Sequence, residues 1–142
     1  MAMFKLTPKK SYRFHYRTTI KVRDVNYGGH LGNDAVVGLL HEARTDFLRS
    51  LGLTELDLGD GETGLIVSDL AVNYRAEGYL FDEIVVHSDI GEVRSTSFRV
   101  YHHVTRGDKT IALAEVGAVA FDYADRRIAE LPEAFLGKIG HG

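Results

Sequence analysis

The chain has 142 residues, of which 26% are charged and 44% hydrophobic, with a formal net charge of −3 and no cysteine. This length is typical of one domain, so we expect a single domain over residues 1–142. The weak net charge excludes an extended nucleic-acid surface, and the lack of cysteine excludes disulfides, thiolate-bound zinc and a cysteine nucleophile. No apolar run reaches the ~20 residues of a membrane helix, and residues 1–10 lack a secretory signal's apolar core, so we expect a cytoplasmic protein that does not bind membranes.

The first predicted element is a strand over residues 12–22, where polar and apolar side chains alternate strictly. Phe14 and Tyr16 fall on one face of this strand, and His15 and Arg17 fall on the other. Such alternation is typical of a strand with one buried face.

The second predicted element is a helix over residues 35–51, with Asn33 or Asp34 as its N-cap and Gly52 just beyond its end. Its first half is apolar nearly all round, so we expect a sheet to enclose it. Gly38 inside the helix indicates close packing against a neighbour, because glycine destabilises a helix. The expected inward-facing residues are Val36, Leu39, Leu40, Ala43, Phe47 and Leu51.

Four further strands are predicted, at residues 65–75, 83–93, 97–105 and 110–123, the last two joined by a tight turn. Alternating alanines in the last strand, at positions 112, 114, 118 and 120, would let the helix pack closely against it. One early helix followed by consecutive antiparallel strands excludes βαβ repetition. The sequence therefore predicts an α+β domain with one curved five-stranded antiparallel sheet wrapped around one long central helix.

Several short motifs carry no function in this context. Residues 59–64 match G-x-G-x-x-G, but they follow a helix and open a strand, the reverse of a dinucleotide site. Residues 106–108 spell Arg-Gly-Asp and read as a turn. His102 and His103 are adjacent in a strand and point to opposite faces, so they cannot chelate one metal. No HExxH or GxSxG motif occurs, and we expect neither a metal nor a cofactor.

Residues 24–34, which we call the elbow segment, lie between the first strand and the helix. They contain three glycines, one histidine and four Asp or Asn residues. Glycines allow close approach of a ligand to the backbone, helix-start amides bind anions, and histidine transfers protons near neutral pH. A simple turn with a helix cap would explain the glycines and Asn33 but would leave His30 and Asn26 without a role. We therefore expect a catalytic site here.

The elbow segment resembles the signature of the hotdog-fold thioesterases, in the branch of 4-hydroxybenzoyl-CoA thioesterase and the plant acyl-ACP thioesterases. That signature is D-x-D near the end of the first strand, often followed by G-H-V-x-N and the central helix. Here Asp24 and Asn26 match the first part, and residues 29–33 match the second. Residues 41–48 and 74–86 are also similar to the family. The resemblance implies the hotdog fold and hydrolysis of an acyl-CoA or acyl-carrier-protein thioester.

The resemblance carries over to individual residues only in part. The family's catalytic acid, the second Asp of D-x-D, falls on Asn26, and the Asn of the plant-type N-x-H falls on Gly28, whereas the histidine is kept as His30. An amide cannot act as a nucleophile or base. We therefore expect His30 to deprotonate a water that Asn26 positions, with Asp24 as a candidate to orient His30.

The remaining site residues are candidates of lower specificity. The main-chain amide that polarises the thioester carbonyl in the family would fall near Asn33, and Glu42 is an alternative base on the helix, although a structural ion pair is the simpler expectation for it. Tyr27, Gly28 and Gly29 would contribute to the pocket, and Arg75, Arg94 and Arg99 are available to meet CoA phosphates.

The resemblance also implies self-association, as a homodimer or a homotetramer of two dimers, with the site built between subunits. Three alternatives stay open: an acyl-thioester-binding protein without hydrolysis, which Asn26 favours; a hotdog hydratase or dehydratase; and a structural subunit without a ligand.

Overall fold

The computed structural model describes residues 3–140. Its elements, in chain order, are β1 (Phe14–Thr19), the 3-10 turn η1 (Val22–Asp24), α1 (Asn33–Ser50), β2 (Thr63–Tyr74), β3 (Glu83–Gly91), β4 (Ser97–Arg106), β5 (Lys109–Asp122), β6 (Arg127–Ile128) and α2 (Glu133–Lys138).

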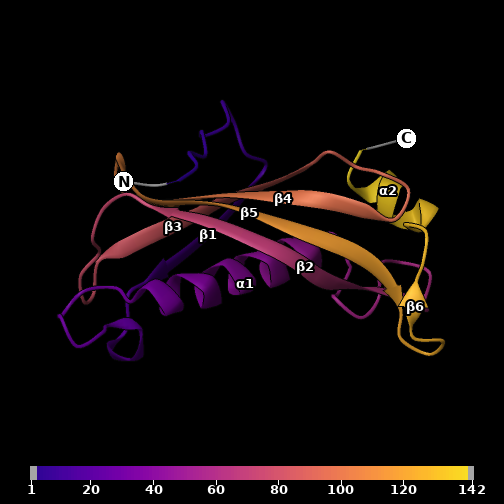
Figure 1. Ribbon diagram of the computed structural model, residues 1–142, viewed down its shortest axis with the longest axis horizontal. Helices are drawn as coiled ribbons and strands as arrows, with labels where there is room; N and C mark the ends of the chain where they lie inside the picture. Colours follow the sequence, from indigo (N-terminus) through magenta and orange to yellow (C-terminus); the bar gives the residue numbers. More distant parts are fainter. Residues whose placement is uncertain (1–2, 141–142) are drawn as a thin grey trace.

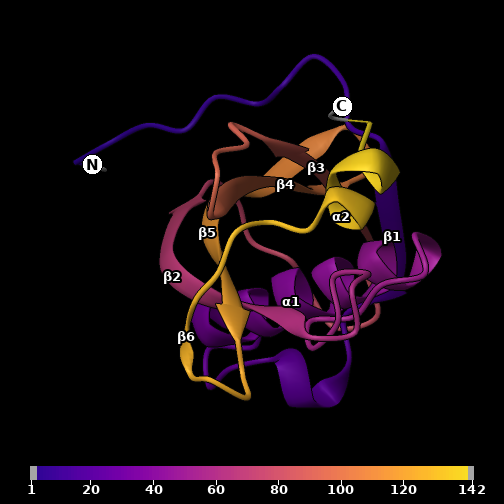
Figure 2. The ribbon, with the colours of Figure 1, turned by 90° about the vertical axis from the view of Figure 1, so that its right-hand side faces the viewer.

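The strands form one antiparallel sheet in the order β1-β3-β4-β5-β2, with the two-residue β6 added beside β5. The sheet curves around α1, which lies along its concave face (Figure 1, Figure 2). The predicted five strands and central helix are therefore confirmed. The sixth strand, β6, is an addition that two residues are too few to reveal by periodicity.

The core lies between α1 and the concave face of the sheet. Toward the C-terminal end of α1, Phe14 of β1 stacks on Phe47 with ring centroids 4.8 Å apart, and Phe98 contacts Phe135 of α2. The predicted inward stripe of α1 is buried except for Leu51, which is half-buried. The alanines of β5 are also buried. The backbone of α1 approaches β3 and β1 most closely, so the predicted close packing of the helix against the small side chains of β5 is not found.

The start of α1 differs from the prediction. Gly32, and not Asn33 or Asp34, is the N-cap, and no side chain caps the helix. The Gly32 amide donates to the Asp24 carbonyl oxygen over 2.9 Å, and its carbonyl accepts from the Val36 amide over 3.2 Å. This pairing with Asp24 holds the chain extended up to Gly32, and the helix then begins at Asn33, two residues earlier than predicted.

One side of α1 is open, which is also contrary to expectation. Val37 is 39% exposed, and a Cβ atom added to Gly38 would meet no atom within 4 Å. The predictions of close packing at Gly38 and of a fully enclosed first half are therefore wrong for the single chain. The curved sheet covers only part of the helix circumference, as the end-on view shows (Figure 2).

The chain before β1 crosses the convex outer face of the sheet (Figure 1). The Leu6 amide donates to Oδ1 of Asn73 over 2.6 Å, and the Arg75 guanidinium donates to the Leu6 carbonyl over 2.7 Å. Within residues 3–140, no helix has the length and hydropathy needed to cross a membrane.

Candidate active site

The elbow segment forms a tight turn between η1 and α1. The Asn26 amide donates to the His30 carbonyl over 2.9 Å, and the Gly29 amide donates to the Asn26 carbonyl over 3.0 Å. Gly29 has a φ of +86°, which favours glycine because a Cβ atom would clash with the backbone. The sequence therefore folds into an elbow because glycine stands where the turn requires it.

The turn brings Asn26 and His30 together over Gly28. A Cβ atom added to Gly28 would lie 3.2 Å from Nε2 of His30 and 3.4 Å from Oδ1 of Asn26. Oδ1 of Asn26 accepts the Gly28 amide hydrogen over 3.0 Å. This bond fixes the orientation of the carboxamide, so the Nδ2 group remains the donor for a ligand or water.

The loop between β2 and β3 supplies a residue that the sequence did not identify. The Leu31 amide donates to the Gly78 carbonyl over 2.8 Å, and His30 forms an isolated bridge with Tyr79. This pairing places Oε1 of Glu77 3.7 Å from Nε2 of His30. The Tyr79 hydroxyl donates to Oε2 of Glu77 over 2.7 Å, and this bond raises the pKa of Tyr79.

Glu77 was missed because it occupies an unspecified position of the segment 74–86, between the matched residues Ala76 and Asp82. The sequence signal that could have found it is Gly78, which directly follows it between two predicted strands. A Cβ atom added to Gly78 would lie 2.6 Å from Cδ1 of Ile20. The glycine thus permits the close approach of this loop to the elbow segment.

The start of α1 adjoins the elbow segment and carries unpaired helix amides. Because the first turn of any α-helix has amides without intrahelical acceptors, and no side chain caps α1, these groups can receive a partial negative charge. The Tyr74 hydroxyl donates to the Asn33 carbonyl over 2.8 Å, which ties the end of β2 to this turn.

Two predicted elbow residues have surroundings that sequence could not indicate. Oδ2 of Asp24 accepts the Lys21 amide hydrogen over 2.8 Å, so this carboxylate stabilises η1. Tyr27 is fully exposed and extends into solvent. Gly28 and Gly29 are also exposed, and the elbow is open to water in the single chain.

The candidate phosphate-binding and alternative catalytic residues lie elsewhere. Arg99 is occupied by ion pairs with Asp69 and Glu115, at 2.7 Å and 2.8 Å. Arg75 remains exposed beside its bond to Leu6. Glu42 is exposed on α1, about 13 Å along the axis from the helix start at ~1.5 Å per residue, and so lies away from His30.

The prediction that Glu42 forms a structural ion pair is wrong. The ion pairs found among residues 3–140 do not include it. Glu55, from the connection after α1, pairs instead with the neighbouring Arg44 and His41, at 3.1 Å and 2.5 Å.

The described residues contain no group of three or more His, Asp or Glu side chains arranged to hold a metal. His102 faces the core, where its Nδ1 lies 2.7 Å from Oγ of Ser88 and its Nε2 has no partner. Burial, together with the charge of Arg44, lowers the pKa of His102 to about 3.

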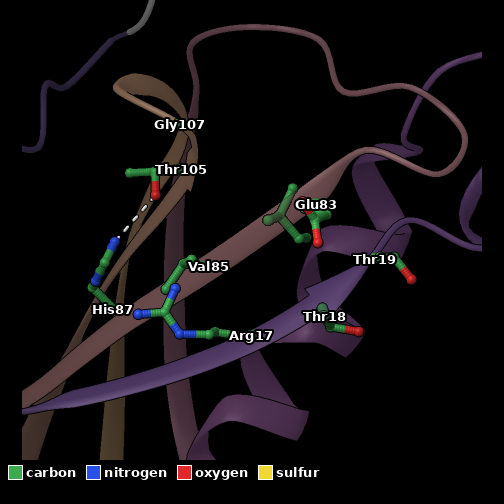
Figure 3. A pocket seen from close by; sticks show the side chains of 9 residues that line it. Arg17, Thr18, Thr19, Glu83, Val85, His87, Thr105 and Gly107 are labelled. Atoms are coloured by element: carbon green, nitrogen blue, oxygen red, sulfur yellow. Dashed lines mark hydrogen bonds between the residues drawn. The ribbon is translucent and has the colours of Figure 1, made fainter.

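A cavity of about 660 Å³ lies on the outer face of the sheet and shares no residue with the elbow segment. Figure 3 shows its lining, with Arg17 of β1 beside His87 of β3 and Thr105 of β4.

The wrapped sheet, the central helix and the elbow at the helix start define a hotdog-type domain. The sequence profile of the thioesterase-like superfamily matches residues 20–139. The chain therefore belongs to the thioesterase-like superfamily, and the resemblance found in the sequence is confirmed.

Individual relatives agree with this assignment. The acyl-CoA thioesterase YbgC of Haemophilus influenzae is 21% identical over 129 residues, which cover 90% of this chain and 95% of the relative. The 1,4-dihydroxy-2-naphthoyl-CoA thioesterase Slr0204 of Synechocystis has the same fold, with a TM-score of 0.80 and 19% identity. The superposition covers 89% of this chain and 95% of Slr0204. The Staphylococcus aureus protein SAV2348, solved in complex with CoA, has a TM-score of 0.83 and 18% identity. The superposition covers 95% of this chain and 87% of SAV2348.

Proposed function

We propose that this protein hydrolyses an acyl-CoA thioester to a free acid and CoA. The observation that carries the proposal is the convergence of His30 and Asn26 over Gly28, beside the uncapped start of α1. Family membership and the activity named for the Haemophilus and Escherichia coli YbgC relatives support it.

The chemistry follows from the donors and acceptors present. Asn26 Nδ2 donates to a water molecule, and the His30 imidazole takes one of its protons as the water oxygen attacks the thioester carbonyl carbon. The carbonyl oxygen becomes an oxyanion held by the amides at the start of α1. The carbon–sulfur bond then breaks, and the imidazolium returns its proton to the departing thiolate.

Glu77 assists this cycle through its charge. At 3.7 Å its carboxylate is too far from His30 for a hydrogen bond. Its negative charge lies near the positive charge that develops on the His30 ring during the reaction. Glu77 therefore acts through its charge, while His30 carries the proton.

The acyl and CoA parts of the substrate would occupy different surroundings. We place the acyl group along α1 and the CoA moiety at the surface, where Arg75 can contact a phosphate with the donors that Leu6 leaves free. A carrier-protein thioester presents the same reacting group, and comparing both substrates would decide between them.

We also propose that the protein works as a homodimer, or as a homotetramer of two dimers. β2 ends the sheet, and an exposed strand edge is a template for pairing. Val67 and Leu70 of β2 are 46% and 41% exposed beside Val37 of α1, and together they line a mainly apolar groove. A second copy would cover this surface and shield the open elbow from water.

A second candidate function is acyl-thioester binding without hydrolysis. Asn26 favours it, because a carboxylate would be the stronger catalytic group at this position.

The deciding experiment measures kcat/KM over a series of acyl-CoA chain lengths. His30→Ala should lower kcat/KM by about tenfold or more while circular dichroism and melting temperature stay unchanged. His15→Ala, on the outer face, is the matched control and should retain activity. Wild-type activity in His30→Ala would remove His30 from the mechanism. Binding of acyl-CoA by the wild type without any turnover would establish the second candidate.

A further inference from the structure

Three histidines stand side by side on the outer face of the sheet. His15 of β1 lies directly opposite His87 of β3, and His87 lies directly opposite His103 of β4. Directly opposed residues of antiparallel strands have Cβ atoms about 5 Å apart, so their side chains meet. Ring centroids are 5.0 Å apart for the first pair and 5.9 Å apart for the second.

The Nδ1 atoms of the first pair face each other within hydrogen-bond distance. Nδ1 of His15 and Nδ1 of His87 are 2.7 Å apart, and Nε2 of His87 lies 3.1 Å from Oγ1 of Thr105 (Figure 3). When Nε2 of His87 donates to Thr105, its Nδ1 carries a lone pair. A metal-binding histidine is typically held in this way, with its second nitrogen donating to a fixed acceptor.

We propose that His15 and His87 form a binding site for a late first-row divalent metal ion such as Zn²⁺, with both Nδ1 atoms as ligands. Two imidazole nitrogens bound to one Zn²⁺ at ~2.1 Å are about 3.0–3.4 Å apart. The pair must therefore open by only a few tenths of an ångström. His15 is exposed, so its ring can move and exchange its Nδ1 proton for one on Nε2 through solvent.

Solvent would complete the coordination. Nε2 of His103 is engaged with Oγ1 of Thr110 over 2.7 Å, and no third ligand is in place among residues 3–140. The site is thus open, with two protein ligands and water. Imidazole suits zinc, nickel and copper better than magnesium or calcium.

Arg17 is the main charge that opposes a cation here. It lies two residues from His15 on the same face of β1 and lines the cavity with His87 (Figure 3). This positive charge gives the proposal a directional test, because its removal should strengthen cation binding. If the histidines instead bound an anion such as phosphate, the removal of Arg17 should weaken binding.

The experiment is calorimetric titration of tag-free full-length protein with zinc chloride and, separately, with inorganic phosphate. We expect one zinc site per chain with a dissociation constant in the micromolar range. His15→Ala and His87→Ala should each weaken zinc binding by about tenfold or more, and Thr105→Val by about tenfold. Arg17→Gln should tighten it, whereas His41→Ala, which removes the histidine beside Glu55, should not change it.

Other outcomes would overturn the site. The first is the absence of saturable zinc binding. The second is zinc binding that His41→Ala abolishes and His87→Ala leaves intact. The third is phosphate binding that Arg17→Gln abolishes. Circular dichroism of each variant shows whether the sheet is intact. Because the site shares no residue with the elbow segment, the thioesterase assay does not decide it.

Discussion

Nε2 of His30 lies 3.7 Å from Oε1 of Glu77, although the two residues belong to different loops. The backbone bond from Leu31 to Gly78 aligns these loops. The imidazole is one-third exposed and the carboxylate more than half exposed, so the charge of Glu77 acts through partly solvated surroundings. The contribution of Glu77 to catalysis should therefore be moderate.

Glu77→Gln should lower kcat/KM by about two- to fivefold, because exposed charge pairs contribute up to ~1 kcal/mol. Steady-state hydrolysis of the best acyl-CoA substrate measures this effect. Glu42→Gln removes an exposed carboxylate of α1 and is the matched control, for which we expect nearly full activity. A collapse of turnover in Glu42→Gln without unfolding would move the catalytic base to the helix.

Gly28→Ala should lower kcat/KM by about tenfold, since small displacements of catalytic groups reduce rates strongly. The added Cβ atom would lie 3.2 Å from Nε2 of His30 and would push the imidazole out of place. Gly28 is exposed and its φ is not positive, so the melting temperature should not change. Gly137→Ala, in open space on α2, is the control; full activity of Gly28→Ala would show that the spacing of Asn26 and His30 is unimportant.

Asn26→Asp should retain activity or increase it. The carboxylate can still accept the Gly28 amide hydrogen that Oδ1 accepts now, and it adds a group that can act as base or nucleophile. The measurement is kcat/KM together with the melting temperature. Complete loss of turnover in a folded variant would mean that the amide donor itself is required.

The free energy of unfolding should fall as the pH is lowered from 6.5 toward 5. Burial lowers the pKa of His102 to about 3, whereas its pKa in the unfolded chain is ~6.5. The unfolded state therefore binds the proton first, and the loss of stability steepens from about 0.7 kcal/mol per pH unit at pH 6.5 toward about 1.4 kcal/mol per pH unit near pH 5. Urea denaturation measures the slope. His102→Gln should flatten it, and an unchanged slope in this variant would contradict the assignment.

Side-chain periodicity was sufficient for the main elements. Alternation around Phe14 predicted β1, and the stripe that contains Leu39 and Phe47 predicted α1, because both patterns record which face of an element is buried. The predicted ends of the elements were less accurate. The N-cap is Gly32 because a backbone bond to Asp24 determines where the helix begins, and no local pattern contains that bond.

Of the candidate site, the sequence predicted the elbow segment but not the loop that carries Glu77. The elbow segment revealed His30 and Asn26, since glycines and a histidine before a helix have few other uses. Glu77 could not be found, because its proximity to His30 depends on how two loops pair. The same holds for Arg99, which appeared free in the sequence but forms ion pairs with Asp69 and Glu115.

The sequence by itself determined the α+β class, the single central helix and the position of the elbow segment, because hydrophobic spacing and glycine placement are local properties. Only the tertiary structure decided which side chains meet: His30 with Glu77, and His15 with His87. These meetings depend on strand register and loop docking, which are set by the packing of the whole sheet around α1.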